Sequence, residues 1–301
     1  MPACGGSFSE LRPRLIASLL LISRPPTKTS QRRLLRYIER VEISEFQSSD
    51  LLRQQPTVID FHHMGIVDFD QCIDLQKRLV YESGGRNDGH ITCLLCEHPP
   101  LISIGRAGSR RHIRLTTQEM RHRQLEMRWI GRGGACVAHT PGQLAVYPIV
   151  PLKHYGWSVG DYLQRLQNGL LDTAREFEVP SYKRPGRFGL WGRSGMLAAI
   201  GVAVQNWITS HGAFLNVTCG PHSQVGVESN PAELACPGDL ATMSSLLEET
   251  ETCPTIGEVA RSVAYHLAQR FGAAQAVWHS SHPLFPEVVK HSRDRTRQAA
   301  S

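Results

Sequence analysis

Residues 131–143 read GRGGACVAHTPGQ, and this glycine-rich stretch says more about fold and function than any other part of the 301-residue chain. Its glycines let the backbone approach a strand or a ligand closely, because no Cβ stands in the way. Arg132 and His139 lie inside the stretch and supply directed hydrogen-bond donors. On these residues alone, an ordinary glycine-rich loop and a ligand-binding loop both remain open.

Strand and helix patterns alternate on both sides of this stretch. The apolar runs predict strands over residues 58–61, 91–96, 143–150, 196–204 and 207–217. Helices are predicted to begin after Asp68, Ser158 and Thr255, each of which has a capping partner three residues on. This mixture predicts an α/β or α+β domain without specifying its topology.

The distribution of composition along the chain predicts one domain with two extensions. Residues 1–55 read as a basic, disordered extension, residues 56–275 as the catalytic domain, and residues 276–301 as a polar tail. Residues 106–128 are very basic and are predicted to form a surface segment. The apolar run at residues 15–22 has Glu10 upstream and no small-residue cleavage site downstream, which disfavours a secretion signal.

The overall balance of residues is that of a globular protein in a reducing compartment. Charged residues make up 20% and hydrophobic residues 41%, and no apolar run approaches the roughly 18 residues that span a membrane. The eight cysteines are scattered along a long chain, which favours reduced thiols and a cytoplasmic location. The net charge of +6 favours acidic partners without choosing among nucleic acid, anionic membrane and acidic protein.

Two short motifs are better explained by structure than by chemistry. Cys93 and Cys96 lie three apart within an apolar strand, so their side chains point to opposite faces and are predicted to be core thiols. Residues 156–160 fit the pattern G-x-S-x-G, but Pro151, Lys153 and His154 separate them from the preceding strand. Ser158 is therefore predicted to cap a helix rather than to act as a nucleophile.

The histidines and glycines give no sign of a metal or nucleotide site. His62, His63, His279 and His282 have no metal-binding spacing and are predicted to be mostly surface residues. No phosphate loop or dinucleotide-binding fingerprint is found in the sequence. The sequence therefore predicts neither a bound metal nor a cofactor.

Two further stretches carry weaker functional signals. Residues 195–201 place small side chains along a strand, which leaves the space that an acyl chain needs, although core packing explains them equally well. Cys236 lies in a turn after a loop rich in Ser, Asn and Pro, where a thiol is more accessible than in a core.

Together these stretches resemble the octanoyl-[acyl carrier protein]:protein N-octanoyltransferases, the lipoyl/octanoyl transferase branch of the biotin/lipoate ligase superfamily. The resemblance covers about residues 58–272. Its segments include residues 96–100 (CEHPP), the Arg132 to His139 loop, residues 198–201 (AAIG) and residues 211–217 (HGAFLNV). It implies a fold with a mixed sheet flanked by helices, like the catalytic domain of biotin/lipoate protein ligases.

The resemblance also implies a mechanism and a site. A cysteine, here Cys236, takes an octanoyl group from octanoyl-acyl carrier protein. The acyl group then passes to a lysine on the lipoyl domains of 2-oxoacid dehydrogenases or on the glycine-cleavage H protein, without nucleic acid or membrane as a partner. The residues expected to line the acyl site are Arg132, Gly133, Gly134, Ala135, Cys136, Val137, Ala138, His139, Ala199, Ile200, Gly201, Gly212, Ala213 and Phe214.

This sequence departs from the family pattern at the cysteine and at a nearby lysine. The family cysteine precedes glycine, whereas Cys236 precedes Pro237, and Cys219 keeps the Cys-Gly pair. Cys236 is preferred because Ser244, Ser245 and Leu246 follow at the family spacing. Met196 occupies the position of the family lysine, which leaves open a catalytically weakened paralogue that binds without turnover; an ATP-dependent lipoate–protein ligase is a further alternative.

Overall fold

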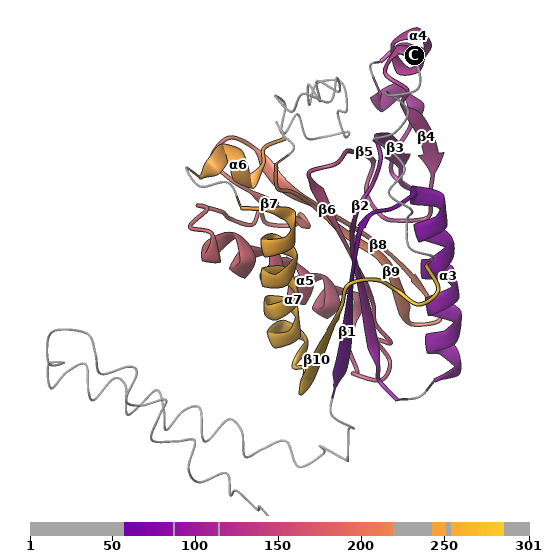
Figure 1. The fold of residues 1–301 in the computed structure, drawn as a ribbon, viewed down its shortest axis with the longest axis vertical. Coiled ribbons are helices and arrows are strands. Elements are labelled where there is room, and N and C mark those ends of the chain that lie inside the picture. The colour runs from indigo at the N-terminus through magenta and orange to yellow at the C-terminus, as the bar shows by residue number, and fades with distance from the viewer. Residues whose placement is uncertain (1–56, 87, 114, 219–242, 251–253, 286–301) are drawn as a thin grey trace, which may run out of the picture. The chain divides into compact units, whose positions relative to one another are not determined.

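A seven-stranded mixed sheet forms the centre of the fold (Figure 1), in a computed structural model that describes residues 57–86, 88–113, 115–218, 243–250 and 254–285. Its strand order is β10-β1-β2-β6-β9-β8-β7. The strands are β1 (Val58–Ile66), β2 (Ile91–Glu97), β6 (Gln143–Ile149), β7 (Gly189–Trp191), β8 (Met196–Gln205), β9 (Ile208–Asn216) and β10 (Gln275–His279). β1 runs parallel to β2 and β10, and the remaining neighbours are antiparallel, so the predicted mixed sheet flanked by helices is confirmed.

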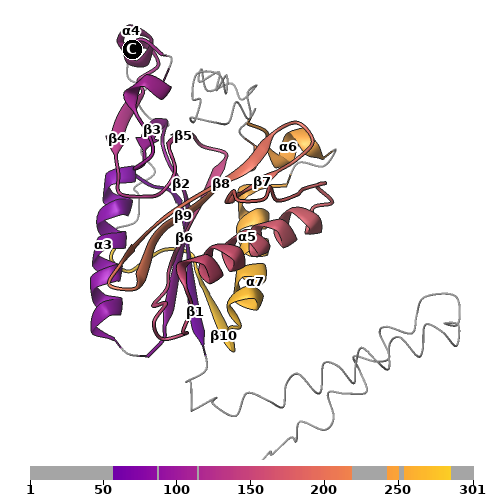
Figure 2. The ribbon, with the colours of Figure 1, turned by 180° about the vertical axis from the view of Figure 1, so that it is seen from behind.

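Helices cover both faces of this sheet (Figure 2). α5 (Val159–Glu176) and α7 (Ile256–Phe271) pack on one face, and α3 (Phe69–Gly85) packs on the other. Gly169 of α5 allows the two helices on the first face to touch, because a Cβ there would lie 2.6 Å from a methyl carbon of Leu267. The predicted caps are confirmed, since Asp68, Ser158 and Thr255 each accept a hydrogen bond from a backbone N–H three residues on.

The strand period explains the two buried cysteines of β2. Cys93 belongs to the core beneath α5 and α7, whereas Cys96 belongs to the core beneath α3. Both thiols are fully buried, and burial raises their pKa values. The prediction that the two thiols point to opposite faces is therefore confirmed.

A second, smaller sheet adjoins the main one. It has the order β4-β3-β5 and consists of β3 (Leu101–Ile104), β4 (Glu126–Trp129) and β5 (Cys136–His139). Between β3 and β4 the chain forms the short helices η1 (Arg110–His112) and α4 (Thr117–His122). The basic segment 106–128 thus does more than lie on the surface, because Ile113, Leu115, Met120 and Leu125 within it bury themselves against this sheet.

The C-terminal boundary predicted at residue 275 falls inside the main sheet. β10 pairs in parallel with β1, from Val58 opposite Gln275 to His62 opposite His279. The segment that follows crosses toward α3 (Figure 1), and Phe285 packs against the core beneath that helix. β10 is an edge strand that pairs on one side only, and its side chains are largely exposed. Its sequence therefore lacks the apolar pattern by which a strand is predicted. Residues 1–55 and 286–301 lie outside the described residues.

Two histidines predicted to lie on the surface are buried instead. His62 and His282 are each only 6% exposed. The partners that cover His62 lie more than 200 residues away in the sequence, because β10 and the segment after it return to β1. None of the helices in the described residues is long and apolar enough to cross a membrane.

Close backbone packing at Gly212 gives a test of the sheet. A Cβ on Gly212 would lie 2.0 Å from the carbonyl oxygen of Val146 on β6, so the strands would have to separate. We expect Gly212→Ala to lower the free energy of unfolding by about 1–3 kcal/mol. Urea denaturation followed by circular dichroism measures this loss.

Gly257→Ala is the matched control, because a Cβ at this helical position meets nothing within 4 Å. We expect it to leave stability unchanged or to raise it by less than about 1 kcal/mol. Equal effects of the two substitutions would contradict the close packing of β6 and β9.

Candidate functional site

The glycine-rich loop between β4 and β5 lies across strand β8. The N–H of Gly133 donates to the carbonyl of Val202 at 2.8 Å. Gly201 permits this crossing, because a Cβ on it would lie 2.5 Å from the carbonyl oxygen of Gly133. On the other side of the loop, Gly105 leaves equal room for the carbonyl of Gly134. Glycines on three separate segments therefore bring the loop into contact with both sheets.

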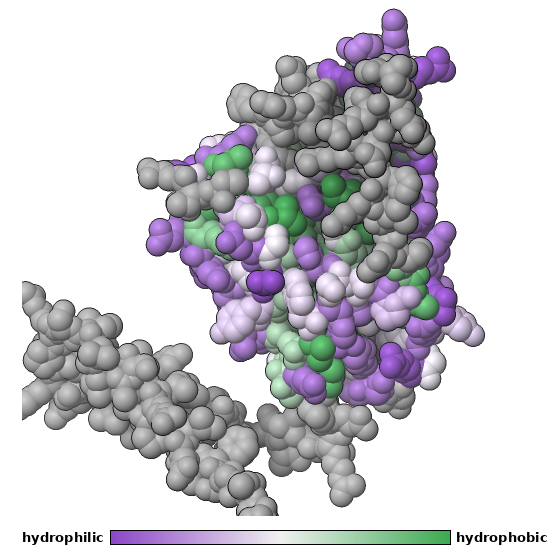
Figure 3. All heavy atoms as spheres, in the orientation of Figure 1, coloured by the Kyte–Doolittle hydropathy of each residue, from purple (hydrophilic) through white to green (hydrophobic). Residues whose placement is uncertain are grey.

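The register of β8 and β9 brings two other predicted segments together. Ala199 pairs with Phe214, Ile200 with Ala213, and Gly201 with Gly212. Residues 199–201 and 212–214 are therefore direct neighbours in the sheet, and the loop crosses them at Gly201. All three segments predicted to line the acyl site thus meet in one place. Apolar side chains gather in the upper middle of the face shown in Figure 3.

The guanidinium of Arg132 is buried at this crossing. Arg132 is 1% exposed, and its Nη2 donates to both the carbonyl oxygen and the hydroxyl of Ser103, at 3.0 and 2.8 Å. Its Nη1 donates to the carbonyl of Gly133, and its Cζ lies 5.6 Å from the ring centre of Phe214. A buried cation needs such partners, because leaving its donors unsatisfied costs several kcal/mol. Arg132 therefore connects the loop, the small sheet and β9.

A chain of buried hydrogen bonds continues from Arg132. The Ser103 hydroxyl donates to His139 Nε2 at 2.7 Å, and His139 Nδ1 donates to Gln143 Oε1 at 2.9 Å. The amide of Gln143 donates to Asn216 Oδ1, and Asn216 Nδ2 donates to the carbonyl of Ser244, both at 2.9 Å. Oε1 and carbonyl oxygens only accept, which fixes the direction of every bond in this chain.

His139 is neutral at physiological pH in this arrangement. Burial lowers its pKa well below the usual value, and the nearby His98 and Arg132 lower it further. Both ring nitrogens of His139 are engaged in the hydrogen-bond chain, and its ring packs edge-on against Phe214. His139 therefore holds the loop in place rather than offering a free base.

Met196 lies where the chain returns from the segment that contains Cys236. It pairs with Trp191 of β7, and Met243 forms a bridge beside it. The N–H of Ser244 donates to the Met196 carbonyl at 2.9 Å, and Ser245 caps the short helix α6 (Leu246–Glu249). Cys236 and Cys219 themselves lie outside the described residues.

Two other basic side chains of this region, Arg193 and His211, have different surroundings. The side chain of Arg193 is 70% exposed and lies 3.4 Å from Glu249. Burial alone would raise the Glu249 pKa, but hydrogen bonds from the backbone of Ser194 and Arg193 hold it below its usual value. His211 is buried, and its pKa falls to about 4 through burial and the charge of Arg132.

Cys136 faces away from the crossing of loop and strand. Its side chain belongs to the core of the small sheet, and its thiol donates to the carbonyl of Ser109. Any contribution of Cys136 to a ligand site would therefore come from its backbone.

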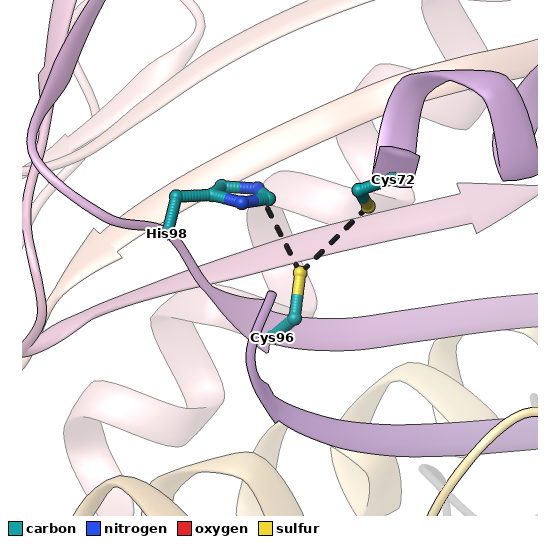
Figure 4. A group of neighbouring side chains, drawn as sticks. All are labelled: Cys72, Cys96 and His98. Carbon is teal, nitrogen blue, oxygen red and sulfur yellow. Dashed lines mark hydrogen bonds between the residues drawn. The ribbon is translucent and has the colours of Figure 1, made fainter. Parts of the chain in front are cut away.

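A cluster of two cysteines and one histidine (Figure 4) lies beside His139, whose ring centre is 5.9 Å from that of His98. Cys72 of α3, Cys96 of β2 and His98 point toward one another, with 4.0 Å between the sulfurs and 3.7 Å from Cys96 to His98 Nε2. His98 Nδ1 donates to the Val67 carbonyl, and its Nε2 accepts from the Tyr147 hydroxyl at 2.8 Å. These three side chains could hold a metal ion, but His98 already has a hydrogen bond on each nitrogen.

Sequence reasoning missed the role of Ser103. This serine is the one polar residue of the short, fully buried strand LISI. A single polar residue in an otherwise apolar run was the sequence feature that could have revealed its role. Ser103 joins Arg132 to His139, two residues that were predicted to belong to the site. A buried hydroxyl in an apolar strand needs a partner, so its position pointed to a polar network.

Removing the Ser103 hydroxyl tests the hydrogen-bond chain. Ser103→Ala takes one partner from buried Arg132 and the donor from His139 Nε2, so we expect a loss of about 1–3 kcal/mol in the free energy of unfolding. Urea denaturation measures it, with Ser210→Ala on the half-buried part of β9 as the control. If the two substitutions lower the free energy of unfolding equally, the hydrogen bonds of Ser103 contribute no stability of their own.

Comparison with known proteins identifies the family. Residues 68–268 match the family model described as the lipoyl protein ligase A/B catalytic domain. An octanoyltransferase of Geotalea uraniireducens is 38% identical over 177 residues, covering 58% of this chain and 77% of that protein. An octanoyltransferase of Acidobacterium capsulatum is 30% identical over 251 residues, covering 77% of this chain and 98% of that protein.

Solved structures share the fold at low sequence identity. A lipoate-protein ligase A crystallised with ATP has a TM-score of 0.58 at 9% identity, covering 74% of this chain and 88% of that one. A bipartite lipoate protein ligase of Thermoplasma acidophilum has a TM-score of 0.51 at 9% identity, with 76% and 87% coverage. With the family model and the relatives above, these results show that the chain belongs to the lipoyl protein ligase A/B catalytic-domain family and is an acyltransferase of its octanoyltransferase branch.

Proposed function

We propose that this enzyme transfers an octanoyl group from octanoyl-acyl carrier protein, through a thioester on Cys236, to a lysine of lipoyl domains. The observation that carries the proposal is the meeting of the loop 131–139 with residues 199–201 and 212–214. We expect the acyl chain to lie beside the small side chains of these segments. The relatives named octanoyltransferase support the acyl group, and the lipoate protein ligases of the same fold support a lipoyl-domain acceptor.

The proposed reaction has two balanced steps. The Cys236 thiolate attacks the carbonyl carbon of the donor thioester, and the pantetheine thiolate leaves and takes up a proton. The neutral lysine amine of the acceptor then attacks the new thioester, loses a proton and releases the Cys236 thiolate as the amide forms. The first step exchanges one thioester for another, and the second forms a more stable amide, so no nucleotide is consumed.

We propose that the buried charge of Arg132 supplies part of the positive field that a thiolate at this site needs. After burial, its charge is a further cause of the lowered pKa values of His139 and His211. A thiolate brought to the same place would be stabilised by the same field.

The proposed partners and location follow from charge and redox state. Acyl carrier proteins are acidic, which suits a chain with a net charge of +6. The glycine-cleavage H protein is a second candidate acceptor. The free thiols of Cys72, Cys93 and Cys96 suit the reducing cytoplasm.

Trapping the acyl-enzyme tests the nucleophile. After incubation with octanoyl-acyl carrier protein, intact mass spectrometry should find an octanoyl adduct that hydroxylamine removes. We expect Cys236→Ala to abolish this adduct and Cys219→Ala to retain it. The reverse pattern would assign the nucleophile to Cys219.

The substitution Met196→Lys tests the missing charge. A free cysteine is only about 3% thiolate at pH 7, and a nearby ammonium group lowers the thiol pKa. We expect Met196→Lys to speed acylation at pH 7 by less than tenfold, because nucleophilicity falls with pKa, and to shift the rate profile to lower pH. Single-turnover acylation from pH 6 to 9 measures both effects.

Met196→Gln is the matched control, because it changes polarity at similar length without adding charge. If wild type and Met196→Lys share one low-pH profile, another group already lowers the Cys236 pKa. His211 would not produce a change across this range, because its pKa is about 4.

Two outcomes would replace the proposal. If wild type and Met196→Lys both fail to acylate at any pH but still bind acyl carrier protein, the chain is a non-catalytic binding member of the family, as Met196 would suggest. If labelling of a lipoyl domain requires lipoate and ATP and survives Cys236→Ala, the chain is a lipoate–protein ligase.

A further inference from the structure

A group of histidines and one aspartate gathers on the α3 side of the sheet edge formed by β1 and β10. Asp60 and His62 are two residues apart on β1, so both side chains point to the same face. His279 lies directly opposite His62 on β10. The segment after β10 then returns His282 to the same place, where its ring centre is 4.5 Å from that of His62.

The distances within this group are those of potential metal ligands. His279 Nε2 lies 3.6 Å from one carboxylate oxygen of Asp60, and His90 Nε2 lies 3.1 Å from the other. The rings of His62 and His279 stack with 4.6 Å between their centres. One ligand atom each from Asp60, His62 and His279 lie within 4.8 Å of one another. Zinc ligands at about 2.0–2.2 Å in tetrahedral geometry lie about 3.4 Å apart, so small side-chain rotations would suffice.

The protonation pattern leaves nitrogen lone pairs available. His62 Nδ1 donates to the carbonyl of Ser281 at 2.9 Å, so in the neutral ring Nε2 carries the lone pair. His279 Nε2 is buried and has no hydrogen-bond partner among the described residues, although a carboxylate oxygen lies just beyond bonding distance. A buried ring nitrogen without a partner is costly and calls for an explanation.

The backbone contact of His62 supports its use as a metal ligand. A hydrogen bond from the second ring nitrogen to a backbone carbonyl, as His62 makes to Ser281, is the usual support of a metal-binding histidine.

We propose that Asp60, His62 and His279 bind a divalent transition-metal ion of the zinc class, with His90 supporting the second carboxylate oxygen of Asp60. Mixed imidazole and carboxylate ligands suit zinc and related ions. The ion would link the last strand to the first across the edge of the sheet. This site is separate from the loop 131–139 and does not depend on the proposed acyl transfer.

The cluster in Figure 4 is the competing location for a metal. Its two thiols and one imidazole are also ligands for zinc, and its three ligand atoms are equally close. However, the Tyr147 hydroxyl already occupies His98 Nε2, and burial raises the Cys96 pKa well above its usual value. Binding there would require removing protons from two fully buried thiols.

Cobalt(II) distinguishes the two locations in the full chain. We expect purified, metal-stripped protein to bind one Co²⁺ with visible d–d absorption and no near-ultraviolet thiolate-to-cobalt charge-transfer band, and Zn²⁺ to displace it. Asp60→Asn and His279→Gln should each weaken binding roughly tenfold or more. Zn²⁺ should also raise the melting temperature of wild type, because it binds only the folded state.

Controls separate this site from other ligands and from misfolding. His122→Gln removes an exposed histidine of α4 and should leave affinity unchanged. Circular dichroism of Asp60→Asn and His279→Gln reports whether the sheet has formed. The proposal is overturned if folded variants bind as tightly as wild type or if wild type binds no ion. A thiolate band that Cys96→Ser removes would also overturn it, by assigning the metal to the cluster of Figure 4.

Discussion

The burial of one guanidinium organises the candidate site. Arg132 is 1% exposed between two sheets, where the carbonyl oxygen of Gly133 and both oxygens of Ser103 accept hydrogen bonds from its guanidinium. Because those acceptors belong to the loop and to the small sheet, these hydrogen bonds connect the two, and the contact of the cation with the Phe214 ring adds β9. His139, Gln143 and Asn216 then extend the same network to Ser244.

The sequence predicted those features that depend on local spacing. The caps at Asp68, Ser158 and Thr255 need only a partner three residues away, and the structure contains each of them. The opposite orientation of Cys93 and Cys96 follows from the two-residue period of a strand, and it too is confirmed. The mixed sheet came from the family resemblance rather than from any pattern in the residues.

Features that depend on distant partners could not be predicted. The burial of His62 and His282 requires β10 to return to β1, and nothing near either residue indicates that pairing. The role of Ser103 becomes visible only in the structure, where its hydroxyl bonds to both Arg132 and His139. The basic segment 106–128 contributes to the core of the small sheet through four apolar residues. These residues are spaced irregularly among arginines, so they show no strand or helix period.

The pairing of β1 with β10 has a consequence for biosynthesis. Val58 and its partner Gln275 are separated by 217 residues, so at about 5–20 residues per second the ribosome needs roughly 10–40 s between them. Throughout that time one side of β1 carries unpaired backbone groups, which are a template for association with other chains. A premature stop codon before residue 275 would make that exposure permanent. Nascent chains and truncated products of this gene should therefore depend on chaperones even where every residue of the candidate site is present.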